Sequence, residues 1–275
     1  MSAPVFLTGP GLLTGLGPGD AYVLEGAEGR HAGVVQRRRQ GERVDVADGA
    51  GTRLRCAIAE SDAGRLVLTV LERDDEPAPP VRLVLAQALA KGDRDELAIE
   101  SATEVGVDEV VPWQAQRSVV VWRGDRAAKS RAKWVATVRQ AAKQSRRAWV
   151  PDVADPVDSR SLAARVRAVV GGGGVAVVLH ETATTPLGRV ALPAPADDGA
   201  PALADGGARA LAPDGAPAPH VLVVVGPEGG ITDDELALLT GAGAGVARLG
   251  PHVLRTSTAG PVALALLAQR LGRWG

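Results

Sequence analysis

The distribution of apolar residues divides the chain into two parts with different periodicities. From residue 81 onward, apolar runs such as Val175–Leu179 and Val221–Val225 are continuous and alternate with stretches of helical period. A strand without polar positions is buried on both faces, as in a parallel sheet covered by helices. The sequence therefore predicts an α/β domain over residues 81–275, with strands at 81–85, 109–112, 175–179 and 221–225 and helices at 93–105, 128–147, 162–169, 233–239 and 261–272.

Residues 1–74 instead contain short β-rich segments separated by turn residues. The segments lie at 21–24, 43–47, 54–58 and 66–71, and their spacing predicts a small β-barrel. The polar, proline-containing stretch 74–80 is predicted to be a linker. Residues 186–219 are rich in Ala, Pro, Gly and Asp and show no periodicity, so we expect a disordered surface insertion there.

Composition narrows the class of protein. The chain has 275 residues, 45% of them hydrophobic and 23% charged, which is ordinary for a globular protein and long enough for two modest domains. The single Cys56 excludes an internal disulfide and offers no metal cluster. There is no signal-peptide pattern after Met1 and no apolar run of membrane length. We expect a soluble, cytoplasmic protein without a metal.

The formal net charge of −1 by itself argues against a nucleic-acid partner, but the distribution of charge argues for one. Residues 117–150 hold ten bases against the single acid Asp125, and residues 29–55 hold seven arginines against three acids. In the predicted helix 128–147, Lys129, Lys133, Gln140, Lys143 and Arg147 fall on one face, and Trp134, Val138, Ala141 and Ala142 fall on the other. The basic face is either a solvated surface or an RNA-binding one, and its lack of acidic partners on the same helix favours RNA.

Two glycine-bearing loops near the carboxyl end form the best candidate for a ligand site. Gly226–Thr232 (GPEGGIT) follows an apolar strand, and Leu249–Ala259 (LGPHVLRTSTA) leads into the last predicted helix. Such loops bring backbone N–H groups close to a small ligand. Thr232 and Glu235 form a capping-box pattern. Without a ligand, the first loop is simply a helix start and the second a strand–turn–helix connection with Ser257 or Thr258 as N-cap. Neither a Rossmann fingerprint nor a P-loop is present.

These loops resemble the signature pair of the RsmE family of SPOUT RNA methyltransferases. The resemblance continues, in the expected order, through Arg30-His31, 41–44, Lys91–Arg94, 102–107 and Gln116–Val120, and so covers nearly the whole chain. It implies a PUA-like N-terminal barrel, a C-terminal trefoil-knot domain and a homodimer. It also implies the activity: S-adenosylmethionine (SAM) donates a methyl group to N3 of a uridine in 16S ribosomal RNA of the small (30S) subunit, without a metal.

The resemblance also implies which residues bind. The residues expected to bind SAM lie in the two loops and at the ends of the preceding strands: Leu179, Val225, Gly226, Pro227, Glu228, Gly229, Gly230, Leu249, Gly250, Val253, Leu254, Thr256 and Thr258. The residues expected to contact RNA are basic or carry amides: Arg30, His31, Arg37, Arg38, Lys91, Arg94, Arg117, Lys129, Lys133, Gln140, Gln144, Arg146 and Arg147.

Arg255 is the candidate catalytic residue. N3 of uridine must lose a proton before it attacks the methyl group, and a guanidinium can stabilise the resulting anion. The proton acceptor stays unassigned between Glu228, which can also bond only to its own loop, and Glu181, which follows a buried strand beside His180.

Two alternative functions differ from this prediction. One is a non-catalytic RNA-binding ribosome-assembly factor, which the intact loops and Arg255 disfavour. The other is a SPOUT 2′-O-ribose methyltransferase, which the N-terminal barrel and the order of motifs disfavour. The chain departs from many family members at Ser101, Lys143, His252 and Ser257, and we expect these departures to affect SAM binding little.

Overall fold

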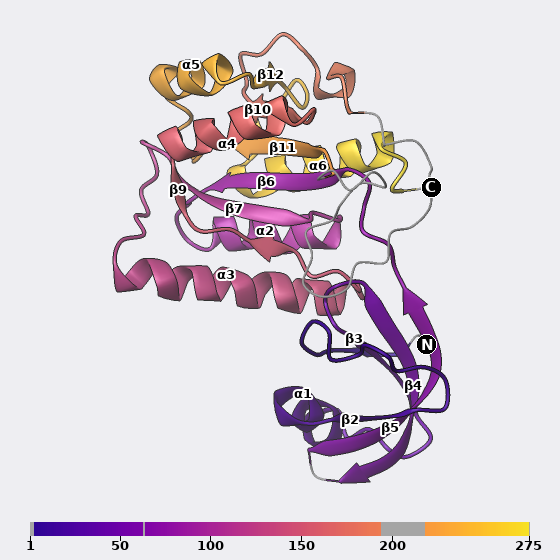
Figure 1. The fold of residues 1–275 in the computed structure, drawn as a ribbon. Helices are drawn as coiled ribbons and strands as arrows, with labels where there is room; N and C mark the ends of the chain where they lie inside the picture. Colours follow the sequence, from indigo (N-terminus) through magenta and orange to yellow (C-terminus); the bar gives the residue numbers. More distant parts are fainter. Residues whose placement is uncertain (1–2, 63, 194–217, 275) are drawn as a thin grey trace. The chain divides into compact units, whose positions relative to one another are not determined.

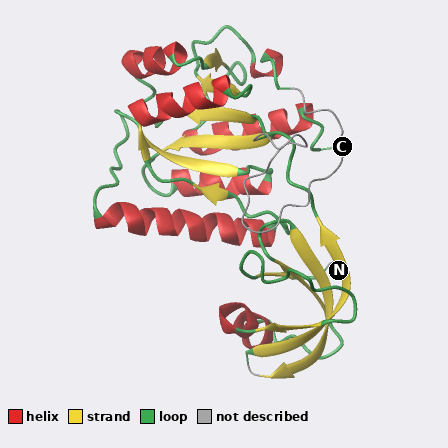
Figure 2. Cartoon of the chain, in the orientation of Figure 1, coloured by secondary structure: helices red, strands yellow, loops and turns green. Residues whose placement is uncertain are grey.

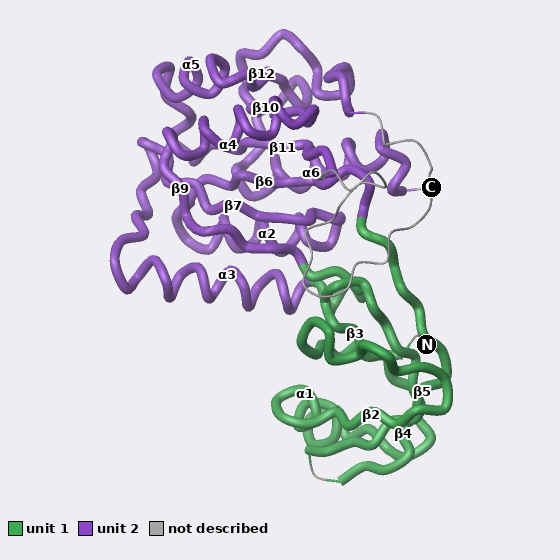
Figure 3. Tube along the Cα trace, viewed as in Figure 1, with its two compact units in different colours: residues 1–78, 142–150, 201–209 green, residues 79–141, 151–200, 210–275 purple. Residues whose placement is uncertain are grey.

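The computed structural model describes residues 3–62, 64–193 and 218–274. The chain divides into two compact units, which Figure 3 colours separately. The described part of unit 1 comprises residues 3–78 and 142–150, and that of unit 2 comprises residues 79–141, 151–193 and 218–274. The end of helix α3 (Asp125–Gln144) and the residues that follow it therefore belong to unit 1, an arrangement that periodicity alone does not indicate.

Unit 1 is built on one five-stranded sheet in the order β1-β3-β4-β5-β2. The strands are β1 (Val5–Leu7), β2 (Ala21–Leu24), β3 (Arg43–Ala47), β4 (Thr52–Asp62) and β5 (Arg65–Asp75), and β2 is followed by α1 (Gly26–Arg30) and a π-helical turn (His31–Val35). The pair β1–β3 is parallel and the others are antiparallel. The four predicted strands are present, but β1 and β2 are left as sheet edges among the described pairings, so these do not close a barrel.

Two features of unit 1 differ from the sequence-based expectation. Strand β5 runs to Asp75 and so takes up Asp74 and Asp75 of the expected linker. Strand β1 was not expected, because a three-residue apolar run shows no measurable periodicity. It lies in the sheet because Val5 and Leu7 pack on Ala47 and on Val150 of the 142–150 segment. Gly51, at φ +103°, permits this segment to approach, because a Cβ there would lie 2.7 Å from the Trp149 ring.

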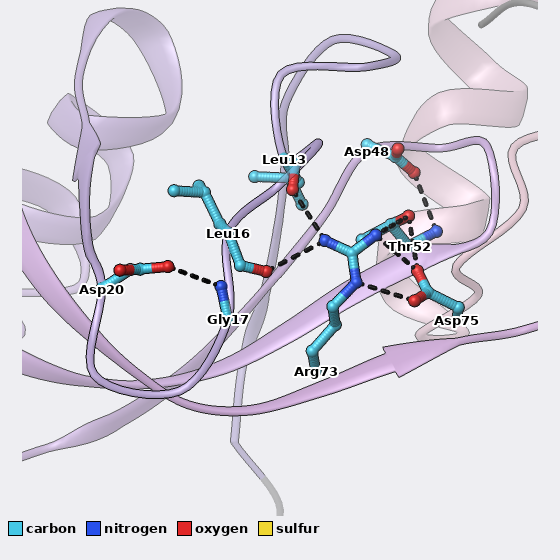
Figure 4. Close-up of polar contacts among 8 residues, drawn as sticks. All are labelled: Leu13, Leu16, Gly17, Asp20, Asp48, Thr52, Arg73 and Asp75. Carbon is cyan, nitrogen blue, oxygen red and sulfur yellow. Dashed lines mark hydrogen bonds and ion pairs between the residues drawn. The ribbon is translucent and has the colours of Figure 1, made fainter. Parts of the chain in front are cut away.

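Arg73 of β5 braces the loop between β1 and β2 (Figure 4). Its Nη1 donates to the carbonyl oxygens of Leu13 and Leu16 at 2.9 and 3.0 Å. Its Nε donates to Asp75 at 2.7 Å, and this hydrogen bond to the guanidinium lowers the pKa of the Asp75 carboxyl. A loop with little regular structure is thus fixed by one side chain that satisfies two of its carbonyls.

Unit 2 is an α/β layer structure with a parallel sheet, as predicted (Figures 1 and 2). The sheet order is β12-β10-β11-β6-β7-β8, with β9 pairing on β7, and every pairing is parallel. The strands are β6 (Arg82–Ala88), β7 (Glu109–Gln114), β8 (Asp152–Val153), β9 (Val157–Asp158), β10 (Val175–Leu179), β11 (His220–Val225) and β12 (Gly245–Ala247). The short strands β8, β9 and β12 are too brief to leave a periodic signal.

Helices cover both faces of this sheet. They are α2 (Arg94–Glu104), α4 (Ser159–Gly171), α5 (Asp233–Gly241) and α6 (Thr256–Arg270). Helices α4 and α5 share a core with Val84, Ala86 and Ala88 of β6, whereas α6 approaches the other face, where a Cβ on Gly260 would lie 3.0 Å from Leu85. The predicted apolar side of α3 is confirmed, because Trp134, Val138, Ala141 and Ala142 are all buried.

Two expectations in unit 2 need correction. Helix α6 begins at Thr256 with Arg255 as N-cap, so Ser257 and Thr258 lie inside the helix and neither is its cap. Pro186 to Val190, at the start of the expected insertion, are ordered by tertiary contacts: Leu187 is buried, and the Arg270 guanidinium donates to the carbonyls of Leu187 and Val190. Residues 194–217, which make up most of the expected insertion, lie outside the described residues.

Candidate functional site

The two glycine loops meet at the carboxyl edge of the parallel sheet. The hydroxyl of Thr256, at the start of α6, donates to the carbonyl oxygen of Gly226 at 2.8 Å. The same hydroxyl accepts from Nε2 of Gln87 at 2.8 Å. Gln87 is fully buried near the end of β6. A three-member hydrogen-bond chain from β6 through α6 to the end of β11 therefore fixes the two loops against each other.

The first loop is held in shape locally. A Cβ on Gly226 would lie 2.6 Å from Cγ1 of Ile231, so this position excludes a side chain. Gly230 has φ +76°, the left-handed region in which glycine is favoured. The predicted capping box is confirmed: the Thr232 side chain accepts from the Glu235 N–H, and the Glu235 carboxylate accepts from the Thr232 N–H. Val225 and Pro227 are buried beneath the loop.

The second loop presents unpaired donors and apolar surface. Within the described part of the chain, the backbone N–H groups of Leu249, Gly250 and His252 to Arg255 donate to no protein acceptor. Val253 is 80% exposed and Leu254 37% exposed. A Cβ on Gly250 would meet nothing within 4 Å. Leu179 lies next to this loop, since it pairs with Ala247, two residues before Leu249. Free N–H groups beside exposed apolar side chains are typical of a site that a small molecule covers.

Glu228 ties the first loop to the Lys91–Arg94 segment. Its Oε1 accepts from the backbone N–H of Lys91 at 3.2 Å and from Nη1 of Arg94 at 2.9 Å. Burial opposes ionisation of this carboxyl, but these bonds and one from its own N–H outweigh it, so the pKa of Glu228 is lowered. A carboxylate that stays ionised and is occupied by two neighbours is poorly suited to accept a proton.

The segment after β7 is tied to the other side of the same loop. Nη1 of Arg117 donates to the carbonyl oxygen of Gly229 at 3.0 Å. Glu235, which is 1% exposed, accepts from the Gln116 N–H at 2.8 Å and from the Ser159 hydroxyl at 2.6 Å. The capping box gave Glu235 a local role, but its bonds to residues far away in the sequence had no sequence signal.

Arg255 has a free side chain at the mouth of the second loop. It is exposed, and its guanidinium has no recorded hydrogen bond or ion pair with any described residue. Its carbonyl oxygen accepts from the N–H groups of Thr258 and Ala259, which fixes its backbone at the start of α6. Thr258 is exposed on the first turn of that helix. A fixed backbone with an unpaired cation suits Arg255 to a ligand or a developing negative charge.

Glu181 and His180 lie at the end of β10. The His180 N–H donates to the Ala247 carbonyl, and Nδ1 of His180 lies 2.8 Å from the Thr182 hydroxyl. Glu181 is exposed and has no recorded partner among the described residues. His180 thus has a structural environment, and Glu181 is a free carboxyl near the second loop.

The basic face of α3 is less free than its sequence suggests. Nζ of Lys133 lies 2.5 Å from Glu96 and 3.7 Å from Asp93, and the hydrogen bond to Glu96 raises the pKa of Lys133. Glu96 belongs to α2, and Asp93 directly precedes that helix. Because neither acid lies on α3, a search for partners within one helix could not find them. Lys129 and Gln140 are exposed and unpaired in the described region.

The remaining expected RNA contacts belong to unit 1. Gln144 and Arg146 are exposed, and Arg147 is partly buried. Arg30 and Arg37 are exposed without a recorded side-chain partner among the described residues. In contrast, Arg38 is paired with Glu42 at 3.2 Å, and the His31 ring lies 3.0 Å from the Gln36 amide and packs edge-on against Phe6.

Neither a metal cluster nor a membrane span is found among the described residues. No group of three or more His, Cys, Asp or Glu side chains could hold a metal ion there. No helix in that part of the chain is both long and apolar enough to cross a membrane.

The fold and the two loops define a parallel α/β domain with a candidate small-molecule site at the carboxyl edge of its sheet. Residues 77–268 match the family described as RNA methyltransferase domain. This match covers well over half of the chain, and the chain therefore belongs to that family.

Named relatives fall within this family. The chain is 43% identical, over 93% of its length and 89% of the relative, to Ribosomal RNA small subunit methyltransferase E of Mycobacterium bovis. It is 29% identical, over 90% and 89%, to the protein of the same name from Bacillus subtilis. Among solved structures, it resembles a Ribosomal RNA small subunit methyltransferase E from Neisseria gonorrhoeae bound to S-adenosyl methionine, with a TM-score of 0.78, 25% identity and 98% of each chain covered.

Proposed function

We propose that this protein transfers a methyl group from SAM to N3 of a uridine in 16S ribosomal RNA. The observation that carries the proposal is the Gln87–Thr256–Gly226 chain, which fixes two glycine loops together at the carboxyl edge of the sheet. Family membership and the names of the relatives support the reaction class and the small-subunit RNA. The N3 position rests on the ordered motifs that resemble the RsmE family.

The residues of the second loop fit SAM. The unpaired N–H groups from Leu249 to Arg255 match the acceptors on an adenine edge and a carboxylate, and Val253 and Leu254 offer an apolar wall for the ring. Gly226 to Gly230, with Val225 and Leu179, would hold the other side. When bound, SAM supplies an electrophilic methyl group on its sulfonium. We further propose that the two loops are the crossings of a trefoil knot.

Arg255 is assigned to the uridine. Loss of the N3 proton spreads negative charge onto the two flanking carbonyl oxygens, and an unpaired guanidinium at the loop mouth can stabilise it. Glu228 instead holds Lys91 and Arg94 in position, so Glu181 is the better candidate for accepting the proton.

RNA is held by both units in this proposal. The exposed, unpaired Arg30 and Arg37 of unit 1 and Lys129 of unit 2 are free to neutralise phosphates. We assign unit 1 a PUA-like, RNA-binding role. Arg38 and Lys133 are already ion-paired, so we assign them a smaller share of the RNA binding. We propose a cytoplasmic location, because the proposed substrate is ribosomal RNA.

A homodimer completes the proposal. Helix α6 exposes Val262 and Leu266, at 38% and 44%, and Leu97 of the neighbouring α2 is 52% exposed. Apolar side chains on packed helices form a surface that a second copy of the chain would cover.

The test is a single-turnover methyl-transfer assay with small ribosomal subunits from cells that lack the protein. Arg255→Ala should lower the rate about 100-fold or more, while the SAM dissociation constant from calorimetry stays within about threefold. Arg248→Ala, at an exposed arginine directly before that loop without a recorded side-chain partner in the described chain, should behave as wild type. Absence of SAM binding by the wild-type protein would favour a non-catalytic assembly factor, and a methyl group on a ribose oxygen would favour the 2′-O-methyltransferase.

A further inference from the structure

Unit 2 contains an open cavity of about 470 Å³ that the proposed SAM site does not use. Its wall is formed by the segment that follows β7 and by the beginning of α4. The side chains that line this wall include Gln116, Ser118, Trp122, Arg123, Asp158 and Arg160. The volume lies in the range of small-ligand sites and is large enough for one nucleotide.

The cavity shares its wall with the first glycine loop. Buried Glu235 accepts hydrogen bonds from Gln116 and Ser159 of the cavity wall and from Thr232 of the loop. Between Gln116 and Ser118, Arg117 donates to the Gly229 carbonyl. In this short segment, Arg117 therefore faces the candidate SAM site, and the adjacent residues Gln116 and Ser118 line the cavity. A ligand in the cavity would lie beside the first glycine loop.

The charge of the cavity favours an anion. Arg123 and Arg160 are exposed, and neither guanidinium has a recorded hydrogen bond or ion pair with a described residue. Asp158 is the one carboxylate among the lining residues, and it is occupied as the N-cap of α4, where it accepts from the Ser161 N–H at 2.8 Å. Arg160 interacts electrostatically with Asp158, but two guanidiniums against one carboxylate leave a positive charge that matches a phosphate group.

The cavity also carries groups that recognise a base or a sugar. The hydroxyl of Ser118 is buried and has no hydrogen-bond partner among the described residues. Gln116 uses its carbonyl oxygen on the Thr232 hydroxyl, and its amide nitrogen has no recorded acceptor in the described chain. Trp122 is positioned by edge-on packing against buried Trp134, with ring centroids 5.2 Å apart. Aromatic rings and arginine planes are the usual stacking partners of unpaired RNA bases.

We propose that this cavity binds a phosphate-bearing nucleotide of unpaired RNA that flanks the target uridine. The inference rests on the proposed function, since the cavity is assigned through its shared wall with that site. An acidic peptide would match the two arginines, but it would leave Trp122 and the unpaired hydrogen-bonding groups of Ser118 and Gln116 without a role. RNA uses all of these groups.

The test measures steady-state methyl transfer for Arg160→Gln, for the double variant Arg123→Gln/Arg160→Gln, and for the control Arg167→Gln. Arg167 lies on the same helix, is exposed, has no recorded partner in the described residues and does not line the cavity. The KM for RNA should rise about fivefold in the single variant and more than tenfold in the double variant. The salt dependence of RNA binding should become shallower by about 0.7 per lost phosphate contact. The KM for SAM and the SAM dissociation constant should not change.

Each of the other outcomes is decisive. Equal KM values for Arg160→Gln and Arg167→Gln would overturn the subsite and leave the methyltransferase function intact. A defect on small subunits that disappears on deproteinised ribosomal RNA would show that the cavity contacts a ribosomal protein, and would also overturn it. A weakened SAM affinity would assign the arginines to the cofactor site. Inactive wild-type protein that does not bind SAM would refute the proposed function, and the subsite with it.

Discussion

At the residue scale, the candidate site depends on side chains that hold loops rather than on side chains that face a ligand. Glu228 illustrates this: the loop that contains it was expected to bind a cofactor, and its carboxylate instead anchors Lys91 and Arg94. Gln87 has the same kind of role for Thr256. Arg255 combines exposure, a guanidinium without a recorded partner among the described residues and a backbone fixed at the start of α6, which is why the chemistry is assigned to it.

The lowered pKa of Glu228 gives a pH prediction. A carboxyl whose pKa is lower in the folded protein than its ordinary 4.5 stabilises the fold above that value, and the contribution is lost as the pH falls through the folded pKa. The unfolding free energy of wild type minus that of Glu228→Gln should therefore be positive and constant between about pH 6 and 8, and should shrink below about 4.5. Urea titrations across this range measure it. Glu104→Gln, at an exposed glutamate at the end of α2, is the matched control, and a trend of equal size in this variant would contradict the assignment.

At the element scale, the two helices that follow the glycine loops differ in how well the sequence predicts their first residue. The start of α5 was predictable, because its capping box is a pattern within four residues. The start of α6 was not, because no side chain caps it. Thr256 begins that helix with its hydroxyl bonded to Gly226, which lies thirty positions earlier in the chain. A helix end fixed by a tertiary contact carries no local sequence signal.

Replacement of Glu235 tests whether hydrogen bonds between distant elements stabilise the fold. Its carboxylate accepts from Thr232, Gln116 and Ser159, so Glu235→Ala leaves several buried donors unsatisfied and should cost about 2–3 kcal/mol of unfolding free energy. Asp234→Ala, at the neighbouring exposed position of the same first turn, should cost no more than about 0.5 kcal/mol. Denaturant titration of both variants measures the loss of unfolding free energy. Similar losses in the two variants would show that Glu235 acts only as an ordinary first-turn acid.

At the scale of the whole molecule, a surface rather than a single contact is expected to control assembly. Leu266→Glu places a charge on the exposed apolar face of α6 and should convert the proposed dimer to a monomer, because a carboxylate buried in an apolar interface is strongly unfavourable. Sedimentation velocity measures the change. Leu238→Glu, on α5 and 36% exposed, is the matched control and should leave the dimer intact. If the wild type is a monomer, the proposed interface does not exist. If Leu238→Glu alone dissociates the dimer, the interface lies elsewhere.

The sequence by itself determined the α/β architecture of unit 2, the apolar face of α3 and the first glycine loop with its capping box. These features arise from periodicity and from turn and cap residues that interact within a few positions, so the order of residues is enough to reveal them. The family followed from ordered motifs.

Only the tertiary structure decided which polar groups are free. Lys133 looked unpaired on its own helix, yet it is bonded to Glu96 of α2. Gln87 meets Thr256 across 169 positions, and Arg94 meets Glu228 across 134. The parallel sheet brings the ends of distant strands to one edge, and hydrogen bonds form there between residues whose separation in sequence carries no information about their proximity.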